Sequence, residues 1–322
     1  MRYRTLGRTG IPVSEIGYGA WGIGQKQWLG GDDGESLRAL RRAIELGLNF
    51  IDTALAYGDG HSERLVGQVA RESSSGLYLA TKVPPKNKKW PARLGTPIED
   101  VFPYAYTVAC TEESLRNLGV DCIDLQQFHV WSPNWLGNDE WKRAIEDLKK
   151  SGKIRYAGIS INDHQPESAL SVIETGLIDT VQVIYNIFDQ SPETRLFPKC
   201  LELNIGVIAR VPLDEGALTG KITEQLSFPA GDFREFYFSG NRKSQVVQHV
   251  SALQRGLEQE SGTLAELALR FVLTHPAVST VIPGMRTLRN VESNCAVPDL
   301  GALKSQTMAV MKKHAWTKNF YQ

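Results

Sequence analysis

The feature that most constrains the fold is a regular alternation of short β-rich runs and amphipathic helical runs along the whole chain. No low-complexity segment or linker interrupts it. Successive strands with a helix in between pair in parallel, and eight such units close into a barrel. We therefore predict an α/β fold, a (β/α)8 TIM barrel, with a doubly wound parallel sheet as the alternative. The eight predicted strands cover residues 15–20, 49–53, 77–83, 122–130, 154–160, 180–186, 205–211 and 278–284.

Further elements extend the minimal barrel. Residues 3–16 contain two short strand patterns around a Gly-containing turn, which predicts a β-hairpin ahead of the first barrel strand. Residues 214–241 show no clear period and predict a long loop of the kind that carries function or moves. Thr263 and Glu266 form a capping-box pattern that starts a helix. An extra helical segment is expected at the C-terminus, within one domain that spans residues 1–322.

The composition excludes several classes of function. The 322 residues include 36 Lys and Arg against 36 Asp and Glu, whereas proteins that bind nucleic acids or anionic membrane surfaces carry a basic excess. Four widely separated cysteines, without a C-x-x-C pair or clustered histidines, favour reduced thiols and no metal site. The sequence has neither an apolar signal core nor an apolar run of about 18 residues. We expect a cytoplasmic protein with a small-molecule partner, and the sequence leaves its oligomeric state open.

One glycine pattern points to a different fold. Gly17, Gly19 and Gly22 match G-x-G-x-x-G, the phosphate-binding turn of dinucleotide-binding domains. That turn follows a strand and opens a helix, whose N-terminus holds the pyrophosphate. Residues 23–34 are rich in glycine and lack helical periodicity. We therefore interpret the match as accidental.

Ionisable residues fall at the carboxyl ends of consecutive predicted strands, where a barrel places its active site. Asp52 ends the second strand, Tyr57 follows in the next loop, and Lys82 and His129 end the third and fourth strands. A free tyrosine, with a pKa of about 10, donates a proton poorly at neutral pH, and a neighbouring ammonium is expected to lower that pKa. A carboxylate holds the lysine, and a histidine orients a substrate oxygen. The set predicts proton delivery to a carbonyl oxygen.

The order and spacing of Asp52, Tyr57, Lys82 and His129 resemble the catalytic tetrad of the aldo/keto reductases. The segments "GLNFIDTALAYGDGHSERLVG", "TKV", "DLQQFH", "GKIRYAGIS" and "IPGMRTLRNVESN" also resemble that family's signatures, nearest to its bacterial reductases and potassium-channel β-subunits. The resemblance implies an NADPH-dependent reductase of aldehydes and ketones, with NADH as an alternative cofactor. It implies that Tyr57 is the general acid, that Lys82 and Asp52 tune it, and that His129 orients the carbonyl.

The resemblance also implies a cofactor that lies extended on the barrel rim without a Rossmann motif. Ser160 and Gln182 would contact the nicotinamide carboxamide, residues 210–221 would cover the pyrophosphate, and residues 284–290 would hold the adenosine phosphate. Arg286 is the expected partner of a 2′-phosphate. The predicted cofactor-binding set is Gly19, Ala20, Trp21, Asp52, Ser160, Asn162, Gln182, Arg210, Pro212, Leu213, Gly216, Leu218, Lys221, Gly284, Met285, Arg286, Asn290 and Asn294.

Three positions depart from the family's pattern. Arg210 stands where many members place an aromatic ring against the nicotinamide, and a guanidinium can stack there instead. Ile161 stands where many members have Asn after the serine, so Asn162 is the candidate replacement. Asn290 stands where Arg or Gln is common, which bears on the preference between NADP and NAD. The predicted substrate-binding residues, which would wall an apolar pocket, are Trp21, Tyr57, Trp90, His129 and Trp131.

Other functions would use the same residues. An aldose or sugar-alcohol dehydrogenase would run the reaction oxidatively with NAD or NADP. A barrel aldolase would form a Schiff base on Lys82, although pairing with Asp52 would keep that lysine charged. A slow-turnover redox-sensing subunit would bind NADPH and use the site little. The sequence leaves open whether the substrate is a simple carbonyl compound or a sugar, and in which direction the reaction runs.

Overall fold

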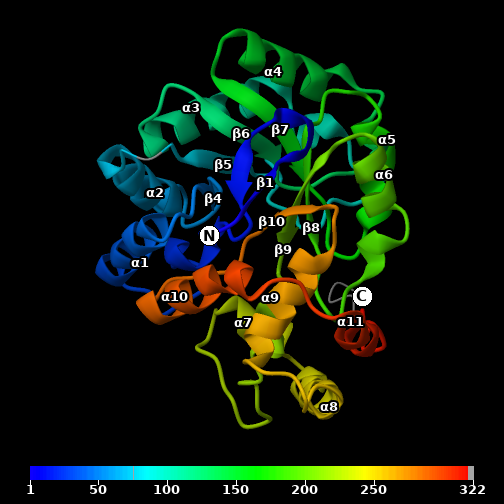
Figure 1. Ribbon diagram of the computed structural model, residues 1–322. Coiled ribbons are helices and arrows are strands. Elements are labelled where there is room, and N and C mark those ends of the chain that lie inside the picture. The colour runs from blue at the N-terminus through cyan, green and yellow to red at the C-terminus, as the bar shows by residue number, and fades with distance from the viewer. Residues whose placement is uncertain (75, 318–322) are drawn as a thin grey trace.

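Eight parallel strands form one curled sheet at the centre of the molecule (Figure 1). The computed structural model describes residues 1–74 and 76–317. Neighbouring strands pair in chain order from β3 to β10, and parallel bridges between Ile16 and Val281 and between Gly19 and Gly284 join the segments of the first and last strands. The strands are β3 (Tyr18–Gly19), β4 (Phe50–Asp52), β5 (Tyr78–Val83), β6 (Ile123–Phe128), β7 (Ile154–Ser160), β8 (Thr180–Ile184), β9 (Gly206–Arg210) and β10 (Val278–Val281).

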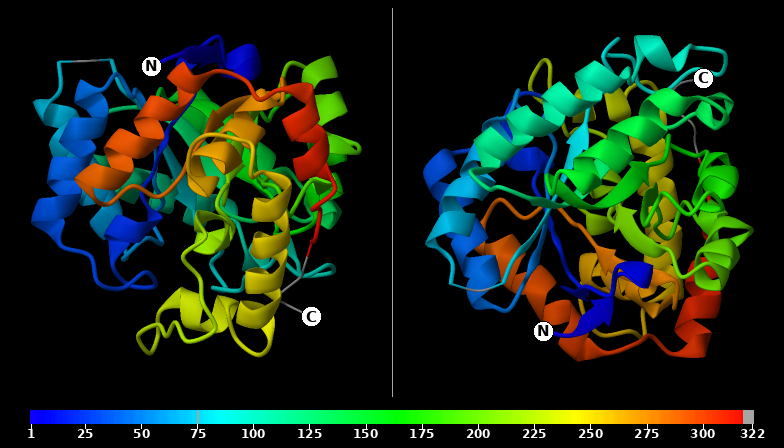
Figure 2. Two further views of the ribbon diagram at one scale, coloured as in Figure 1. Left: turned by 60° about the horizontal axis from the view of Figure 1, so that its bottom comes forward. Right: turned by 90° about the horizontal axis from the view of Figure 1, so that it is seen from above.

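Helices surround the strands, as the two views of Figure 2 show. The helix Asp33–Glu45 (α1) buries one face, with Ala39, Leu40 and Ala43 at helical spacing. The helices are α1 (Asp33–Glu45), α2 (His61–Glu72), α3 (Tyr104–Leu118), α4 (Asp139–Lys150), α5 (Leu170–Ile173), α6 (Leu196–Glu202), α7 (Phe233–Tyr237), α8 (Arg242–Gly256), α9 (Leu264–Thr274), α10 (Leu288–Ala296) and α11 (Ser305–Lys312).

This architecture confirms the predicted (β/α)8 barrel with its extensions. Each predicted strand range contains an observed strand, and the sequential strand order excludes the doubly wound sheet. Thr263 and Glu266 form the expected capping box at the start of α9, and α11 supplies the C-terminal helical segment. The long connection 214–241 contains a short 3₁₀ helix, Asp214–Thr219, and α7.

An N-terminal hairpin closes the end of the barrel at which the strands begin. β1 (Tyr3–Thr5) pairs antiparallel with β2 (Pro12–Ser14), and the adjoining side chains point into the barrel. Figure 2 (left) shows this hairpin at the opposite end of the molecule from α7. Since side chains fill this end, the active site is expected at the other end. The apolar floor consists of Leu6, Ile11, Val13, Phe50, Ala80, Leu125, Ile208 and Ile282.

Gly19 serves barrel closure, and no phosphate-binding turn forms around it. A Cβ on Gly19 would lie 2.6 Å from the carbonyl oxygen of Ile282, so only glycine fits between β3 and the end of β10. After β3 the chain forms a 3₁₀ helix, Trp21–Gly24, and α1 begins only at Asp33. The helix N-terminus that a dinucleotide-binding turn requires is therefore not in place, which confirms that the glycine pattern is accidental.

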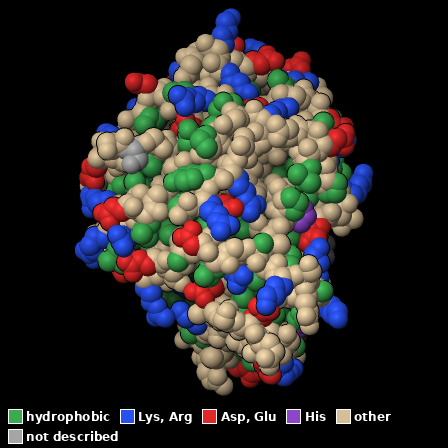
Figure 3. All heavy atoms as spheres, in the orientation of Figure 1, with side chains coloured by type: hydrophobic (Ala, Val, Ile, Leu, Met, Phe, Trp, Pro, Cys, Tyr) green, Lys and Arg blue, Asp and Glu red, His purple; other side chains and the backbone are tan. Residues whose placement is uncertain are grey.

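Charges of both signs are interspersed over the surface. On the face shown in Figure 3, Lys and Arg side chains alternate with Asp and Glu side chains, in keeping with 36 residues of each sign. Exposed ion pairs neutralise these charges locally, as Arg41 and Glu72 do with their nearest N and O atoms 2.8 Å apart. Across residues 1–74 and 76–317, no helix combines the length and apolarity that a membrane crossing requires.

Replacing Leu6 with alanine is expected to lower the free energy of unfolding by about 2–5 kcal/mol, because the side chain is fully buried and its loss leaves a cavity. Urea unfolding followed by circular dichroism measures the change. Leu201→Ala is the matched control, because Leu201 is 52% exposed and its truncation should cost less than about 1 kcal/mol. Equal losses in both variants would contradict the role assigned to the floor.

Candidate active site

The four residues of the predicted tetrad lie together at the open end of the barrel. Asp52 is the last residue of β4, Lys82 lies one residue before the end of β5, and His129 directly follows β6. Tyr57 lies in the loop between β4 and α2. Because these strands are parallel neighbours, their carboxyl ends converge on one rim.

Lys82 is the centre of this arrangement. Its side chain is fully buried, and Nζ lies 2.6 Å from Asp52 Oδ2, 2.8 Å from the carbonyl oxygen of Thr53 and 3.2 Å from the hydroxyl of Tyr57. A lysine ammonium has three donors, and here each of them has an acceptor. The burial of this charge is tolerated because it is paired and fully hydrogen-bonded.

Two amide side chains that the sequence analysis did not connect with Asp52 hold its other oxygen. Asp52 Oδ1 accepts hydrogen bonds from Gln127 Nε2 at 3.0 Å and from Gln182 Nε2 at 2.8 Å, and all three side chains are buried. The carboxylate therefore has donors at both oxygens, which fixes its orientation toward Lys82. Gln127 lies two residues before His129, and the alternation of side chains along β6 is the signal that would have found it.

Burial and charge act in opposite directions on the proton affinities of the central pair. Burial alone would lower the pKa of the Lys82 ammonium, but attraction to Asp52 and Tyr57 outweighs it, and the pKa is raised. For Tyr57, burial raises the pKa by more than the Lys82 ammonium lowers it. The expected net lowering of the Tyr57 pKa is therefore wrong for this structure. The phenol is protonated at neutral pH.

His129 packs between two aromatic rings. Its ring centroid lies 5.6 Å from that of Tyr57 and 5.7 Å from that of Trp90, in edge-on contacts. Burial, followed by the positive charges of Lys82 and Arg210, holds the pKa of the imidazole well below its usual value. The ring is therefore neutral at neutral pH, and its buried Nδ1 has no hydrogen-bond partner among the described residues.

Close backbone contact between two loops sets the position of Tyr57. A Cβ on Gly24 would lie 2.8 Å from the Tyr57 carbonyl carbon, and one on Gly58 would lie 2.2 Å from the Gly24 oxygen. Gly58 also has a φ of 67°, which glycine adopts without strain. These two glycines let the loop after β4 lie directly against the loop after β3, with Tyr57 directed to Lys82.

Aromatic residues from two distant segments form one wall beside Tyr57. The ring centroid of Trp21 lies 6.3 Å from that of Tyr57, 5.3 Å from that of Trp28 and 5.0 Å from that of Phe233. The backbone N–H of Phe233 donates to the carbonyl oxygen of Gln27 at 2.7 Å, which ties α7 to the loop after β3. Trp28 and Phe233 thus pack against Trp21 at its predicted position beside the site. The sequence analysis did not identify these two residues.

The two remaining tryptophans predicted to wall the pocket lie in different places. Trp90 is 41% exposed at the rim, beside His129. Trp131 is fully buried and packs against Trp135 and Trp141, with centroid distances of 5.7 and 5.2 Å. The prediction of Trp131 as a substrate-binding residue is therefore wrong. After β6 the chain turns outward, so this indole enters the core beneath α4.

Ser160, the last residue of β7, pairs in register with Gln182, the middle residue of β8, and both side chains are buried. The side chain of Asn162, by contrast, forms hydrogen bonds with the loop after β5. Its Oδ1 accepts a hydrogen bond from the backbone N–H of Ala92, and its Nδ2 donates to the Ala92 carbonyl oxygen, both at 3.1 Å. The Asn162 amide therefore anchors the loop after β5, and this contact does not favour its predicted role beside the nicotinamide.

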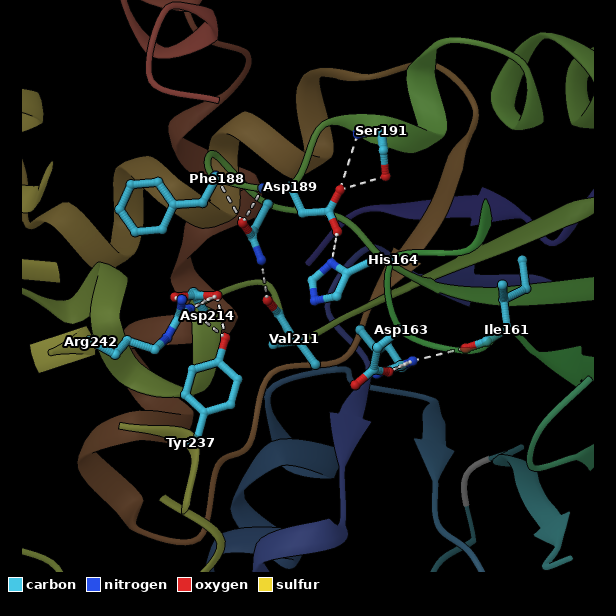
Figure 4. A network of polar contacts seen from close by, with 12 residues as sticks. Ile161, Asp163, His164, Phe188, Asp189, Ser191, Val211, Asp214, Tyr237 and Arg242 are labelled. Atoms are coloured by element: carbon cyan, nitrogen blue, oxygen red, sulfur yellow. Dashed lines mark hydrogen bonds and ion pairs between the residues drawn. The ribbon is translucent and has the colours of Figure 1, made fainter. Parts of the chain in front are cut away.

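Arg210 is held in place by Asp163, a residue that the sequence analysis did not single out. Arg210 Nη2 donates to the carbonyl oxygen of Ile161 at 2.9 Å and forms an ion pair with Asp163. Asp163 and Ile161 lie at one side of the polar network in Figure 4. The guanidinium is thus fixed at the end of β9, where it was predicted to meet the nicotinamide.

The segment predicted to cover the pyrophosphate is a turn that a buried polar network stabilises (Figure 4). Val211, Asp214 and Glu215 have φ values of 53°, 48° and 54°, a backbone region that costs such residues about 1 kcal/mol or more each. Asn186 Nδ2 donates to the Val211 carbonyl oxygen at 2.9 Å, and Arg242 Nη2 lies 3.0 Å from Asp214 Oδ2. The supporting residues come from distant segments, so no local pattern revealed them.

The same turn carries little negative charge despite its acidic sequence. Tyr237 donates a hydrogen bond to Asp214, whose carboxylate is also paired with Arg242. Burial, together with the charges of Asp214 and Asp163, raises the pKa of Glu215 to about 8. Glu215 is therefore largely protonated at neutral pH, which removes a repulsion that an anionic cofactor would otherwise meet.

The segment predicted to hold the adenosine phosphate leads into α10. Thr287 caps this helix, with Oγ1 accepting from the backbone N–H of Asn290 at 3.3 Å, and Arg286 Nη1 donates to the Leu29 carbonyl oxygen at 2.9 Å. A guanidinium beside a helix N-terminus fits a phosphate group. Among the other predicted cofactor residues, Ala20, Pro212, Leu218, Met285 and Asn294 are buried, and Leu213, Gly216, Lys221, Gly284 and Asn290 reach the surface.

A model described as the aldo/keto reductase family matches residues 15–315, and the chain belongs to this family. It is 30% identical over 301 residues to the aldo-keto reductase YhdN of Bacillus subtilis, covering 91% of this chain and 87% of the relative. It is 28% identical to the NADH-specific methylglyoxal reductase of Escherichia coli, covering 92% and 93%. A solved aldo/keto reductase from Klebsiella pneumoniae, in complex with NADP and acetate, is 26% identical with a TM-score of 0.72, covering 99% and 98%.

Replacing Lys82 with methionine is expected to lower the free energy of unfolding by about 3–5 kcal/mol, because Asp52 becomes a buried carboxylate without its cation. Urea unfolding at pH 7 measures the loss. The double variant Asp52→Asn/Lys82→Met should recover part of the loss, because it leaves no unpaired charge. A single variant as stable as the wild type would show that the ammonium does not hold the site together.

Acidification is expected to destabilise the wild type more than a His129→Gln variant. The folded-state pKa of His129 is depressed, so below its unfolded-state value of about 6.5 only the unfolded chain binds a proton there. This stability is present above pH 6.5 and is lost as the pH falls toward the folded-state pKa, by about 1.4 kcal/mol per pH unit. Urea unfolding of both proteins at pH 7.5 and 5.5 measures the difference, and parallel losses would argue against a neutral buried imidazole.

Proposed function

We propose that this aldo/keto reductase reduces an aldehyde or ketone to the alcohol with NADPH, NADH being the alternative, and that Tyr57 is the general acid. The observation that carries the proposal is the 3.2 Å contact between the Tyr57 hydroxyl and the buried Lys82 ammonium, beside the neutral ring of His129. As a member of the family the protein is an oxidoreductase, and its relatives are linked to NADH or NADP. Their small carbonyl substrates support the same substrate class here.

The residues at the rim fit a nicotinamide dinucleotide. Ser160 and Gln182 would hold the carboxamide, and Arg210 would face the nicotinamide ring. The turn at residues 211–216, with Glu215 protonated, would lie along the pyrophosphate. Arg286 and the N-terminus of α10 would hold the adenosine phosphate. The bound cofactor supplies the hydride.

The tetrad side chains then have distinct tasks. His129, neutral and fixed between Tyr57 and Trp90, orients the carbonyl oxygen. Tyr57 donates its phenolic proton to that oxygen, and the phenolate that remains is stabilised by the Lys82 ammonium at 3.2 Å. Asp52 keeps the ammonium in place. Because the free site holds Tyr57 protonated, it is prepared for reduction more than for the oxidative reaction of a sugar-alcohol dehydrogenase.

The contacts of Lys82 disfavour a Schiff-base aldolase. An amine attacks a carbonyl through its free electron pair, and Lys82 is protonated with a raised pKa and all three N–H groups engaged. A redox-sensing subunit would need no proton donor, so the complete tetrad supports turnover.

Tyr57→Phe is expected to lower kcat by about 10²–10⁴-fold, because it removes the general acid and little else. Oxidation of NADPH by a panel of aldehydes and ketones, followed by nicotinamide absorbance, measures the loss. NADPH binding, followed by quenching of protein fluorescence, should stay within a factor of about two, since the phenyl ring is retained. Turnover at the wild-type rate would remove Tyr57 from the proposed role.

A further inference from the structure

The loop between β5 and α3, residues 84–101, is firmly anchored next to the tetrad. The side-chain amide of Asn162 forms two hydrogen bonds of 3.1 Å with the backbone of Ala92. The indole Nε1 of Trp135 donates to the Thr96 carbonyl oxygen at 2.8 Å. These contacts fix the position of the loop at the rim, relative to the carboxyl ends of the strands.

This loop carries four cations that form no ion pair with any residue that the structure describes. Lys86, Lys88, Lys89 and Arg93 are all exposed. Within the part of the chain that the structure describes, none of these four side chains takes part in an ion pair, a side-chain hydrogen bond or a contact with an aromatic ring. Most cations elsewhere near the site are paired, as Lys82 is with Asp52. An unpaired cluster of this kind raises the local concentration of anions.

Three of these four cations, Lys86, Lys89 and Arg93, line one hollow. A hollow of about 330 Å³ is lined by Lys86, Asn87, Lys89, Arg93, Thr96 and Asp100. Its lining carries three positive charges and one negative charge, together with amide and hydroxyl groups that can donate hydrogen bonds. The hollow thus offers the charge and the donors that a phosphate or carboxylate group requires.

The same loop reaches the catalytic residues through Trp90. This indole lies between Lys89 and Arg93 in the sequence, and its ring centroid is 5.7 Å from that of His129. His129 in turn lies 5.6 Å from Tyr57, ring centroid to ring centroid. Trp90 therefore places the cationic loop, of which it is part, beside the catalytic residues.

We propose that residues 84–101 form an anion subsite for the substrate, and that the protein acts on carbonyl compounds that bear a phosphate or carboxylate group. The proposal rests on the proposed reductase function and adds the substrate class. The cofactor phosphate is assigned elsewhere, at Arg286 before α10, and β10 is separated from β5 by β3 and β4 around the barrel. The cations of the loop remain available for the substrate.

The test compares matched carbonyl compounds with and without an anion. Succinic semialdehyde is paired with butanal, and glyceraldehyde 3-phosphate with glyceraldehyde, so that carboxylate and phosphate are distinguished. The wild type should show a higher kcat/KM for at least one anionic member. In Lys89→Gln/Arg93→Gln that preference should fall by about tenfold through KM, with the neutral members changed less than about twofold. Lys150→Gln/Arg255→Gln, which removes two exposed charges from α4 and α8, should leave both unchanged.

Inorganic phosphate provides a readout that needs no particular substrate. Isothermal titration calorimetry of the wild type should show saturable phosphate binding that Lys89→Gln/Arg93→Gln weakens about tenfold. In turnover assays phosphate should compete with the carbonyl compound, and competition with NADPH alone would instead place it at the cofactor site and overturn the proposal. Equal kcat/KM for anionic and neutral members, with Tyr57→Phe inactive on both, would overturn the subsite and leave the reductase function standing. Unchanged phosphate binding in the double variant would also overturn the subsite.

Discussion

The buried ammonium of Lys82 is the constraint on which the site depends. A charge without contact with water requires a full set of acceptors, and Asp52, Thr53 and Tyr57 supply them from one neighbouring strand and the loop that follows it. Gln127 and Gln182 support the second oxygen of Asp52 and so fix the carboxylate toward the ammonium. The barrel interior is consequently layered, with an apolar floor beneath the hairpin and a polar layer above it. The predicted tetrad lies where the second layer meets the rim.

Much of this organisation was predictable from the sequence because it follows from periodicity. The strand and helix alternation determines where each carboxyl end lies, so the convergence of Asp52, Lys82 and His129 could be predicted without a structure. The same argument could have predicted Gln127, because the two-residue period of a strand places it beneath His129. Trp131 was assigned wrongly because proximity to a strand end does not reveal which way the chain turns.

Other features could not be predicted, because they arise between segments that are far apart in the chain. Phe233 and Gln27 meet only when α7 folds against the loop after β3. The direction of the Tyr57 pKa shift depends on how far burial outweighs a nearby charge, and sequence reasoning supplies the charge but not the burial. The left-handed turn at Val211 and Asp214 is maintained by Asn186 and Arg242 through contacts that no local pattern encodes.

The chain order of the barrel has a consequence for how such enzymes diversify. The four tetrad residues all precede β7, whereas the turn after β9 and the helix α10 follow it. A crossover between genes at the connection from β6 to β7 would therefore exchange most of the half proposed to bind the dinucleotide. It would keep intact the half that carries the proposed proton donor. The well-paired seam of β6 and β7, with five register partners, is the surface that such a hybrid would have to conserve. The two halves of the barrel could then evolve at different rates within one fold.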